Sequence, residues 1–207
     1  MKNVVIYGSG SLAREIYDFE YSQCVPRVHF VGYINDLGND PVFESQTSLP
    51  KVDLEPKNSA VEYLICIADP VARFAIINKI KNLNLSLYTY IHPTALISKS
   101  AYIADGCIIY PYVVISANAH LGRSVILNTY SGVGHDVIIG DCSTVSAHVD
   151  LTGYVNIGDC CFIGSGARVA PRKKIGANSK IGTGVAVIRS LKENSTIFPT
   201  PNKVQHD

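Results

Sequence analysis

The feature that most constrains the fold is an aliphatic residue at every sixth position over half of the chain. From Ile91 to Val187 each sixth residue is Ile, Leu or Val, without a change of register. A period of six fits neither the 3.6-residue period of a helix nor the two-residue period of a strand. It predicts a short strand followed by a corner, repeated many times. The positions are Ile91, Ile97, Ile103, Ile109, Ile115, Leu121, Leu127, Val133, Ile139, Val145, Leu151, Ile157, Ile163, Val169, Ile175, Ile181 and Val187.

Two further positions of the six-residue repeat support this interpretation. The fifth residue is usually small or branched, as in Ala95 and Val113, with Lys173 and Leu191 as exceptions, so we expect the first and fifth residues to point inward. The second residue is often glycine, where we expect a positive φ or close backbone approach. Three repeats make one triangular coil, and the sequence predicts a parallel β-helix of about five to six coils.

The first 88 residues follow a different pattern, which begins with a strand, a tight turn and a helix. Val4–Tyr7 is a short apolar run typical of a buried parallel strand. The next six residues, 8–13, read Gly-Ser-Gly-Ser-Leu-Ala and match G-x-G-x-x-A, which lets the backbone approach a phosphate at a helix N-terminus. A helix over Leu12–Phe19 is predicted to follow.

The rest of this segment predicts two more strands and a second helix. The strand His29–Ile34 ends at Asn35 and Asp36, where an acidic residue can bind a ribose or base. The strand Tyr63–Ala68 is followed by a helix that reaches about Lys81. This pattern predicts an abbreviated Rossmann-like α/β domain over residues 1–88 with room for one nucleotide. The alternative is a small α/β cap without a ligand.

Composition excludes several classes of function. The formal net charge of +1 and a pI near 7.6 argue against nucleic-acid or membrane-surface binding. No apolar run reaches the roughly 18 residues that span a bilayer, and the N-terminus lacks a signal-peptide pattern. Of the six cysteines, Cys142 and Cys160 are eighteen residues apart and should stack on adjacent coils. We expect a cytoplasmic protein with free thiols.

One polar cluster lies near the middle of the predicted prism, and it is the candidate for chemistry. It comprises Asn128, His135, Asp136, Thr144 and His148. His135 is at an outward position beside Asp136, where an imidazole can take a proton at neutral pH. The alternative is an ordinary surface histidine.

Two other patterns bear on ligands. From Asp159 onward there are eight Lys or Arg against three acidic residues, which suits a ligand with several phosphates or, alternatively, a solvated face.

A zinc site of the kind known on such prisms needs a close pair of histidines, whereas His120, His135 and His148 are fifteen and thirteen residues apart. We therefore expect no metal.

Taken together, these motifs resemble a known family along nearly the whole chain. The repeats, the stretches 135–141 and 153–158, the segment 111–115 and the loop at Gly8 are similar to the bacterial nucleotide-sugar acetyltransferases of the hexapeptide superfamily. The most similar group contains the sialic-acid O-acetyltransferases and the UDP-4-amino-sugar N-acetyltransferase of bacillosamine synthesis. The resemblance implies a left-handed β-helix over residues 89–207 and a homotrimer with sites between adjacent prisms. It also implies acetyl-CoA as co-substrate.

The resemblance also assigns roles to residues. His135 matches the general base, Asp136 the acid that polarises it, and Asn128 a residue near the reacting amine. The resemblance implies that the nucleotide contacts Gly8, Gly10, Ser11, Leu12, Asn35 and Asp36. It implies that acetyl-CoA contacts Thr144, Gly153, Ser165, Gly166, Pro171, Arg172 and Gly184, with the Gly153 N–H facing the thioester carbonyl.

The chain departs from the family at three places. Thr144 stands where the family often has a second histidine, and the loop reads Gly10-Ser11-Leu12 where the family often has Gly-Gly-His. Residues 199–203 read Pro-Thr-Pro-Asn-Lys where the family usually has Gly-x-Pro-Ala-Lys. From Arg189 the tail leaves the six-residue register, and we expect it to be irregular or extended and to lie over the outside of the prism or contact a neighbouring subunit.

The predicted function is acetyl transfer from acetyl-CoA to the C4 amine of a nucleotide-activated 4-amino-4,6-dideoxy sugar in bacterial glycan biosynthesis. Two alternatives stay open: O-acetylation of a sugar such as sialic acid, and a non-catalytic trimeric scaffold that binds a sugar nucleotide. The nucleotide, whether UDP, dTDP or GDP, also stays open.

Overall fold

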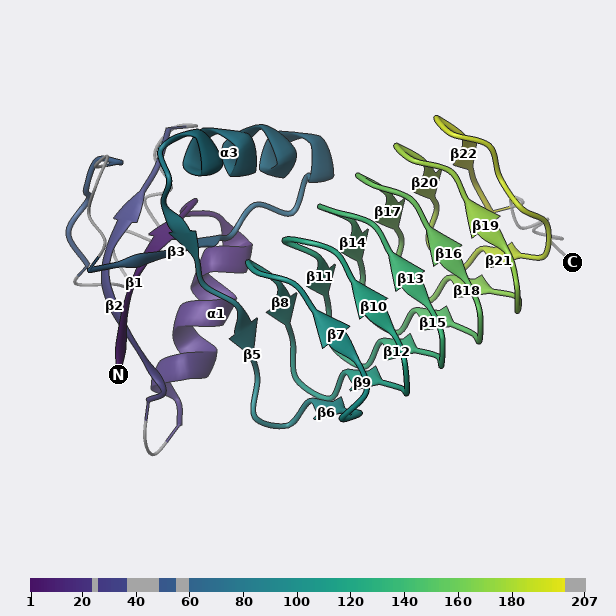
Figure 1. Ribbon diagram of the computed structural model, residues 1–207, viewed down its shortest axis with the longest axis horizontal. Helices are drawn as coiled ribbons and strands as arrows, with labels where there is room; N and C mark the ends of the chain where they lie inside the picture. Colours follow the sequence, from purple (N-terminus) through teal and green to yellow (C-terminus); the bar gives the residue numbers. More distant parts are fainter. Residues whose placement is uncertain (24–25, 37–48, 55–59, 200–207) are drawn as a thin grey trace, which may run out of the picture.

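The computed structural model describes residues 1–23, 26–36, 49–54 and 60–199, and it has two parts (Figure 1). The N-terminal part is a four-stranded parallel sheet with the strand order β2-β1-β3-β4. Its elements are β1 (Lys2–Tyr7), α1 (Ser11–Tyr21), β2 (Val28–Ile34), β3 (Glu62–Ile65), α3 (Pro70–Asn82) and β4 (Ser86–Leu87). The predicted strands and both predicted helices are present. This small parallel sheet with two helices is all that the described residues show, so the Rossmann-like assignment stays a prediction.

Local sequence explains where the second of these helices begins and why the third strand is short. Asp69 caps α3, because its Oδ1 accepts a hydrogen bond from the Ala72 N–H at 2.8 Å, and Pro70 occupies the first turn. The third strand was expected to reach Ala68, but it ends at Ile65. The carbonyls of Ile67 and Ala68 instead accept hydrogen bonds from the Arg73 guanidinium.

The second part is a parallel β-solenoid of about six turns. Each of its strands has two residues, and those from β5 to β21 end on the predicted aliphatic residues. Face 1 contains β5 (Tyr90–Ile91), β8 (Ile108–Ile109), β11 (Ile126–Leu127), β14 (Thr144–Val145), β17 (Phe162–Ile163), β20 (Lys180–Ile181) and β22 (Thr196–Ile197). Face 2 contains β6 (Leu96–Ile97), β9 (Val114–Ile115), β12 (Gly132–Val133), β15 (Asp150–Leu151), β18 (Arg168–Val169) and β21 (Ala186–Val187). Face 3 contains β7 (Tyr102–Ile103), β10 (His120–Leu121), β13 (Ile138–Ile139), β16 (Asn156–Ile157) and β19 (Lys174–Ile175).

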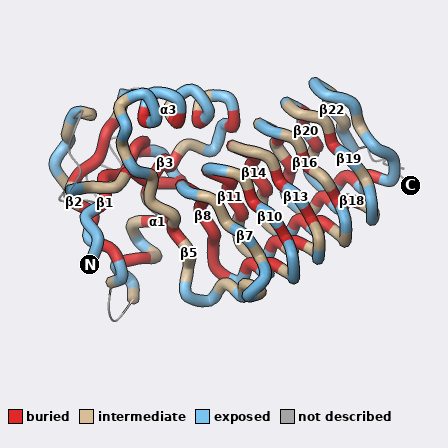
Figure 2. The backbone as a smooth tube through the Cα atoms, in the orientation of Figure 1, coloured by how far each residue is buried: buried red, intermediate tan, exposed pale blue. Residues whose placement is uncertain are grey.

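The register confirms the predicted coil length. Each strand from β5 to β18 pairs with the strand eighteen residues later, as Leu127 does with Val145, so like aliphatics stack inside the prism. Most first and fifth repeat residues are buried, and the buried interior runs the length of the solenoid (Figure 2). The aliphatic stack is therefore the core of the prism.

The corners confirm the close backbone approach expected at the second-position glycines, but the positive φ lies elsewhere in the repeat. A positive φ occurs at the fourth residue of each repeat, from Gly106 to Gly184, with values between 52° and 77°. The glycines at the second position have no positive φ, and they serve close packing instead. A Cβ added to Gly158, for example, would lie 2.6 Å from the backbone nitrogen of Ala177 in the next coil.

The fourth residues form three edges, which we name by what they carry. The aromatic edge, between faces 1 and 2, contains Tyr112, Tyr130, His148, Gly166 and Gly184. The histidine edge, between faces 2 and 3, contains Asn118, Asp136, Tyr154 and Arg172, with His135 next to Asp136. The covered edge, between faces 3 and 1, contains Gly106, Ser124, Cys142, Cys160 and Asn178, and its Cys142 packs into a core cluster with Tyr7, Ile65 and Ile77.

The tail corrects a second expectation. Leu191 bridges to Ile175 and β22 pairs with β20, so residues up to Ile197 add two sides of a last coil. These pairs are sixteen residues apart instead of eighteen, because the connection after Val187 is two residues shorter. The residues after Val187 therefore leave the six-residue register, but they still pair with strands of the solenoid. Residues 200–207 lie outside the described part.

Cys66, Cys107, Cys142, Cys160 and Cys161 are free thiols, and Cys24 lies outside the described residues. Neither helix in the described part of the chain is long and apolar enough to cross a bilayer.

Candidate active site

His135 and Asp136 form a hydrogen-bonded pair on the histidine edge. The His135 Nδ1 lies 2.8 Å from Asp136 Oδ2, and the Asn118 Nδ2 donates to Asp136 Oδ1 at 3.3 Å. The hydrogen bonds from His135 and then Asn118 lower the pKa of Asp136, so this carboxylate is ionised at neutral pH. An ionised acceptor at Nδ1 holds the proton there and leaves Nε2 with its lone pair unprotonated. The His135 side chain is 56% exposed, so a substrate can reach it.

The next coil is shaped around this imidazole. A Cβ added to Gly153 would lie 2.5 Å from His135 Nε2, so only glycine leaves room for the ring. Tyr154 meets the ring edge-to-face with centroids 5.0 Å apart, and the Arg172 guanidinium lies 4.6 Å from the Tyr154 ring centroid. Within the described residues no backbone carbonyl accepts the Gly153 N–H, which is therefore available to a bound oxygen.

The structure divides the other predicted acetyl-CoA residues among different parts of the prism. Pro171 and Arg172 share the histidine edge with His135, because each lies one coil beyond residues 153 and 154. The corner glycines Gly166 and Gly184, with Ser165 next to Gly166, belong to the aromatic edge. Asn128 also lies next to that edge, and its Oδ1 accepts from the Thr129 N–H at 2.6 Å.

Thr144 lies apart from both groups. It is buried on face 1, where its hydroxyl donates to the Ala68 carbonyl at 2.8 Å and accepts from the Arg73 guanidinium at 2.8 Å. Both hydrogen bonds join it to the N-terminal part. The structure therefore does not bring Thr144 to His135.

The predicted nucleotide residues meet at the carboxyl end of the N-terminal sheet. Gly8 has a φ of 110°, and its N–H donates to the Ile34 carbonyl at 2.8 Å. Gly10 is the N-cap of α1, and the Arg14 N–H makes the first helical hydrogen bond to the Gly10 carbonyl at 3.2 Å. The amides of residues 11–13 thus precede the helical bonds and face outward, as anion-binding helix N-termini do.

Asp36 is anchored beside this loop by two residues that the sequence did not indicate. The Tyr7 hydroxyl donates to its carboxylate, and the Lys79 Nζ lies 3.2 Å from Asp36 Oδ2. The hydrogen bond from Tyr7 is the main reason that the pKa of Asp36 is lowered. Asp36 therefore stays charged next to the loop, where its partly exposed carboxylate can accept from a ligand hydroxyl or amide.

These clusters do not form one site within a single chain. The histidine edge and the aromatic edge are separate corners of the prism, and the N-terminal part contacts the third corner, the covered edge. Within the described residues no hydrogen bond or ion pair joins the Gly8 loop to His135. A site that uses all the predicted residues therefore needs edges from more than one chain.

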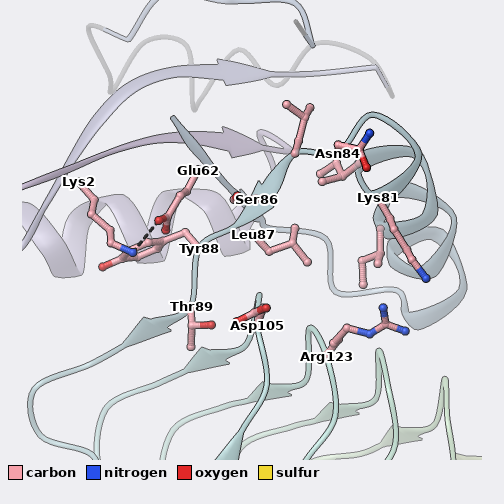
Figure 3. A pocket seen from close by; sticks show the side chains of 13 residues that line it. Lys2, Glu62, Lys81, Asn84, Ser86, Leu87, Tyr88, Thr89, Asp105 and Arg123 are labelled. Atoms are coloured by element: carbon pink, nitrogen blue, oxygen red, sulfur yellow. Dashed lines mark hydrogen bonds and ion pairs between the residues drawn. The ribbon is translucent and has the colours of Figure 1, made fainter. Parts of the chain in front are cut away.

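A cavity of about 710 Å³ lies elsewhere, between the strand β4, the end of α3 and the solenoid (Figure 3). Lys81 and Arg123 point toward one another at one side, while Lys2 pairs with Glu62 at 2.6 Å at the other. Arg123 is itself paired with Asp141 at 2.8 Å. None of the predicted site residues lines this cavity, so it is distinct from the candidate active site.

A metal site is also absent among the residues that the structure describes, where no three His, Cys, Asp or Glu side chains gather.

Comparison with known proteins gives a consistent class. No family model matches the sequence, and no curated protein sequence matches it. Several solved structures match at least 98% of this chain with TM-scores above 0.8. The acetyltransferase domain of PglB from Neisseria gonorrhoeae FA1090 has a TM-score of 0.83 at 21% identity, covering 98% of this chain and 99% of that one. WeeI from Acinetobacter baumannii AYE has a TM-score of 0.82 at 21% identity, covering 99% and 100%.

One similar structure also carries ligands. It is perosamine N-acetyltransferase from Caulobacter crescentus, in a histidine-to-asparagine variant, in complex with CoA and GDP-perosamine. The TM-score is 0.84 at 26% identity, and the match covers 100% of this chain and 98% of that chain.

Proposed function

We propose that this chain is an acetyl-CoA-dependent N-acetyltransferase that acts on the C4 amine of a nucleotide-activated 4-amino-4,6-dideoxy sugar. The observation that carries the proposal is the His135–Asp136 pair, exposed on the edge of a solenoid whose whole length matches a GDP-perosamine-bound N-acetyltransferase. An exposed imidazole whose Nε2 lies next to Gly153 is suited to take a proton from an attacking amine.

In the proposed reaction the amine nitrogen attacks the thioester carbonyl carbon of acetyl-CoA. As the C–N bond forms, His135 Nε2 takes the amine proton, while Asp136 holds the proton on Nδ1. General-base help of this kind contributes roughly 10²–10⁴-fold to a rate. The tetrahedral intermediate then expels the CoA thiolate by breaking the C–S bond, and the imidazolium returns the proton to that sulfur. The step involves no change of oxidation state and is balanced by the acyl transfer and the proton transfer alone.

The Gly153 N–H supports the intermediate in this proposal. A carbonyl oxygen that becomes negatively charged next to His135 can accept this amide hydrogen, and one such donor contributes about 10²–10³-fold. Pro171 and Arg172 follow on the same edge, so we propose that CoA lies along it toward the C-terminal coils. Several basic residues lie in those coils, including Arg168, Lys174 and Lys180, and suit the phosphates of CoA.

The acceptor requires the N-terminal part and a second chain. We propose that residues 1–88 form a Rossmann-like nucleotide-binding domain, with the pyrophosphate at Gly8, Gly10, Ser11 and Leu12 and with Asn35 and Asp36 on the nucleoside. Residues 89–207 would be a left-handed solenoid that assembles as a homotrimer. The aromatic edge of one chain, with Asn128, Ser165, Gly166 and Gly184, would then face the histidine edge of the next. The free thiols of the described cysteines fit a reducing cytoplasm.

A substrate panel tests this proposal. Purified chain is incubated with acetyl-CoA and UDP-, dTDP- and GDP-linked 4-amino sugars, including GDP-perosamine, and release of the CoA thiol is followed with a chromogenic disulfide. We expect saturable turnover with one of these acceptors and little with free sialic acid. Turnover of sialic acid alone would show O-acetylation instead. Absence of turnover together with absence of CoA binding by calorimetry would favour the non-catalytic scaffold.

A further inference from the structure

A buried arginine links the N-terminal part to the solenoid through several hydrogen bonds. Arg73, in the first turn of α3, is completely buried, and none of the five acceptors of its side-chain hydrogen bonds is a carboxylate. Its Nε donates to the Ser124 carbonyl at 2.9 Å, and its Nη2 donates to the Cys142 carbonyl at 2.6 Å. Both acceptors lie on the covered edge of the prism. Burial lowers the pKa of Arg73 to about 10, so the guanidinium is charged at neutral pH.

The remaining donors of Arg73 hold the loop between β3 and α3. The Nη1 donates to the Ile67 carbonyl at 2.5 Å and to the Ala68 carbonyl at 3.0 Å. With the bond from Nη2 to Thr144 Oγ1, every N–H of the guanidinium has an acceptor. Three of the five bonds reach the solenoid and two reach the loop, so the group ties one part of the molecule to the other.

Thr144 closes this arrangement from the solenoid side. Its hydroxyl accepts from Arg73 and donates to the same Ala68 carbonyl that Arg73 holds. A hydroxyl can do both at once, and a methyl group in its place can do neither. Loss of this acceptor would leave a buried donor on a charged group with one partner fewer.

The loop between β3 and α3, which Arg73 holds, packs against the loop that begins at Gly8. A Cβ added to Gly8 would lie 2.8 Å from the Cys66 carbonyl oxygen and 3.2 Å from Ile67 Cγ1, so the two loops are in direct contact. The Cys66 N–H also donates to the Tyr7 carbonyl at 2.8 Å. Any displacement of residues 66–68 therefore moves Gly8 and the start of α1.

We propose that Arg73 and Thr144 are positioning residues that fix the nucleotide loop relative to the prism, and so set where the acceptor sugar reaches the acetyl group. The proposal rests on the proposed function and adds to it a task for Thr144 other than contact with acetyl-CoA. In this proposal, binding of the nucleotide sugar depends on the contacts of Arg73 and Thr144. Binding of acetyl-CoA along the histidine edge does not depend on them.

The first test compares Thr144→Val with Thr144→Ser in steady-state kinetics. Valine keeps the volume and removes the hydroxyl, and serine restores it. We expect Thr144→Val to raise the KM for the nucleotide sugar about tenfold, as a lost hydrogen bond to a charged group does, with the KM for acetyl-CoA within about twofold of wild type. Thr144→Ser should return the acceptor KM to within about threefold of wild type. Equal rises in both KM values, or an unchanged acceptor KM, would overturn the proposal.

The second test does not depend on turnover. Hydrogen–deuterium exchange of the full-length variants reports the amides of residues 8–13 and 66–68 directly. We expect Thr144→Val to speed exchange of these amides about tenfold, with Thr144→Ser close to wild type. The inner strands β12 and β15 should not change in either variant. Unchanged exchange at residues 66–68 would refute the proposed role of Arg73 and Thr144. Faster exchange there, in a protein that turns over none of the tested nucleotide sugars, would refute only the proposed function.

Discussion

Two edges of the same prism show how one repeat serves two purposes. Asp136 and Cys142 occupy the same repeat position, and both have a φ near 58°, of 57° and 59°. Cys142 is fully buried beneath the N-terminal sheet, and its carbonyl accepts from Arg73. Asp136 is bonded to the exposed His135 on an edge that nothing in the described chain covers.

The six-residue repeat thus determines the backbone conformation of a corner residue, and the residues packed around that corner determine what its side chain does. Because a corner residue contributes nothing to the aliphatic stack, it can be a core thiol on one edge and part of an acid–base pair on another. Changes on the histidine edge should therefore affect turnover, and changes on the covered edge should affect stability.

The largest expected effect is on the histidine edge. His135→Ala removes the proposed base, and we expect kcat/KM to fall roughly 10²- to 10⁴-fold with an unchanged melting temperature. His120→Ala is the matched control, because His120 lies on face 3 and stacks on Tyr102 with centroids 4.5 Å apart. Steady-state assays of CoA release on both variants check this. Equal activity of the two variants would remove His135 as the base.

The next effect tests the notch beside the imidazole. Gly153→Ala places a methyl group 2.5 Å from His135 Nε2, so the ring must turn, and we expect a loss of roughly 10²-fold in kcat. Gly132→Ala is the control on the coil that carries His135, because the nearest atom to an added Cβ there is 3.8 Å away. A wild-type kcat for Gly153→Ala would show that the ring position is not critical.

The third effect compares the two edges directly by stability. Cys142→Ala opens a small cavity under the sheet, and we expect the free energy of unfolding to fall by about 1.5 kcal/mol. Asp136→Ala should change it by less than about 0.5 kcal/mol, because that side chain is at the surface. Urea unfolding measures both. The reverse order would contradict the assignment of the two edges.

The smallest effect is a dependence on alkaline pH. Burial raises the pKa of the Cys142 thiol to about 12, above the value of 9.0 for a free thiol. The unfolded chain therefore releases this proton at lower pH than the folded chain, and stability should fall as the pH rises from 9 toward about 12. Between about pH 8 and about pH 10, wild type should lose roughly 1 kcal/mol more than Cys142→Ala. Parallel curves for the two proteins would contradict this.

The sequence predicted the solenoid and the histidine pair well, for physical reasons. Aliphatic residues at a fixed period have few ways to be buried, so Ile91 through Val187 specified the coil length directly. His135 and Asp136 are adjacent in sequence, so their pairing needed no knowledge of the tertiary structure. The corner at the fourth position was missed, because residues as different as Tyr130, Asp136 and Cys142 adopt it and leave no compositional signal.

What the sequence did not predict depends on contacts between distant segments. The carbonyls of Ser124 and Cys142, which accept hydrogen bonds from Arg73, lie about fifty and seventy residues away from it in the sequence. Tyr7 and Lys79 likewise meet Asp36 only in the folded sheet. The Tyr154 ring beside His135 could have been anticipated, because it lies eighteen residues after Asp136 and hence one coil further along the same edge.

The most direct measurement is a structure of the chain with CoA and the nucleotide 4-amino sugar that it turns over. We predict the amine nitrogen at roughly 3 Å from His135 Nε2 of one chain. The pyrophosphate should lie at the Gly8–Leu12 loop of a neighbouring copy. An acceptor bound far from His135, or a complete site within a single isolated chain, would contradict the account.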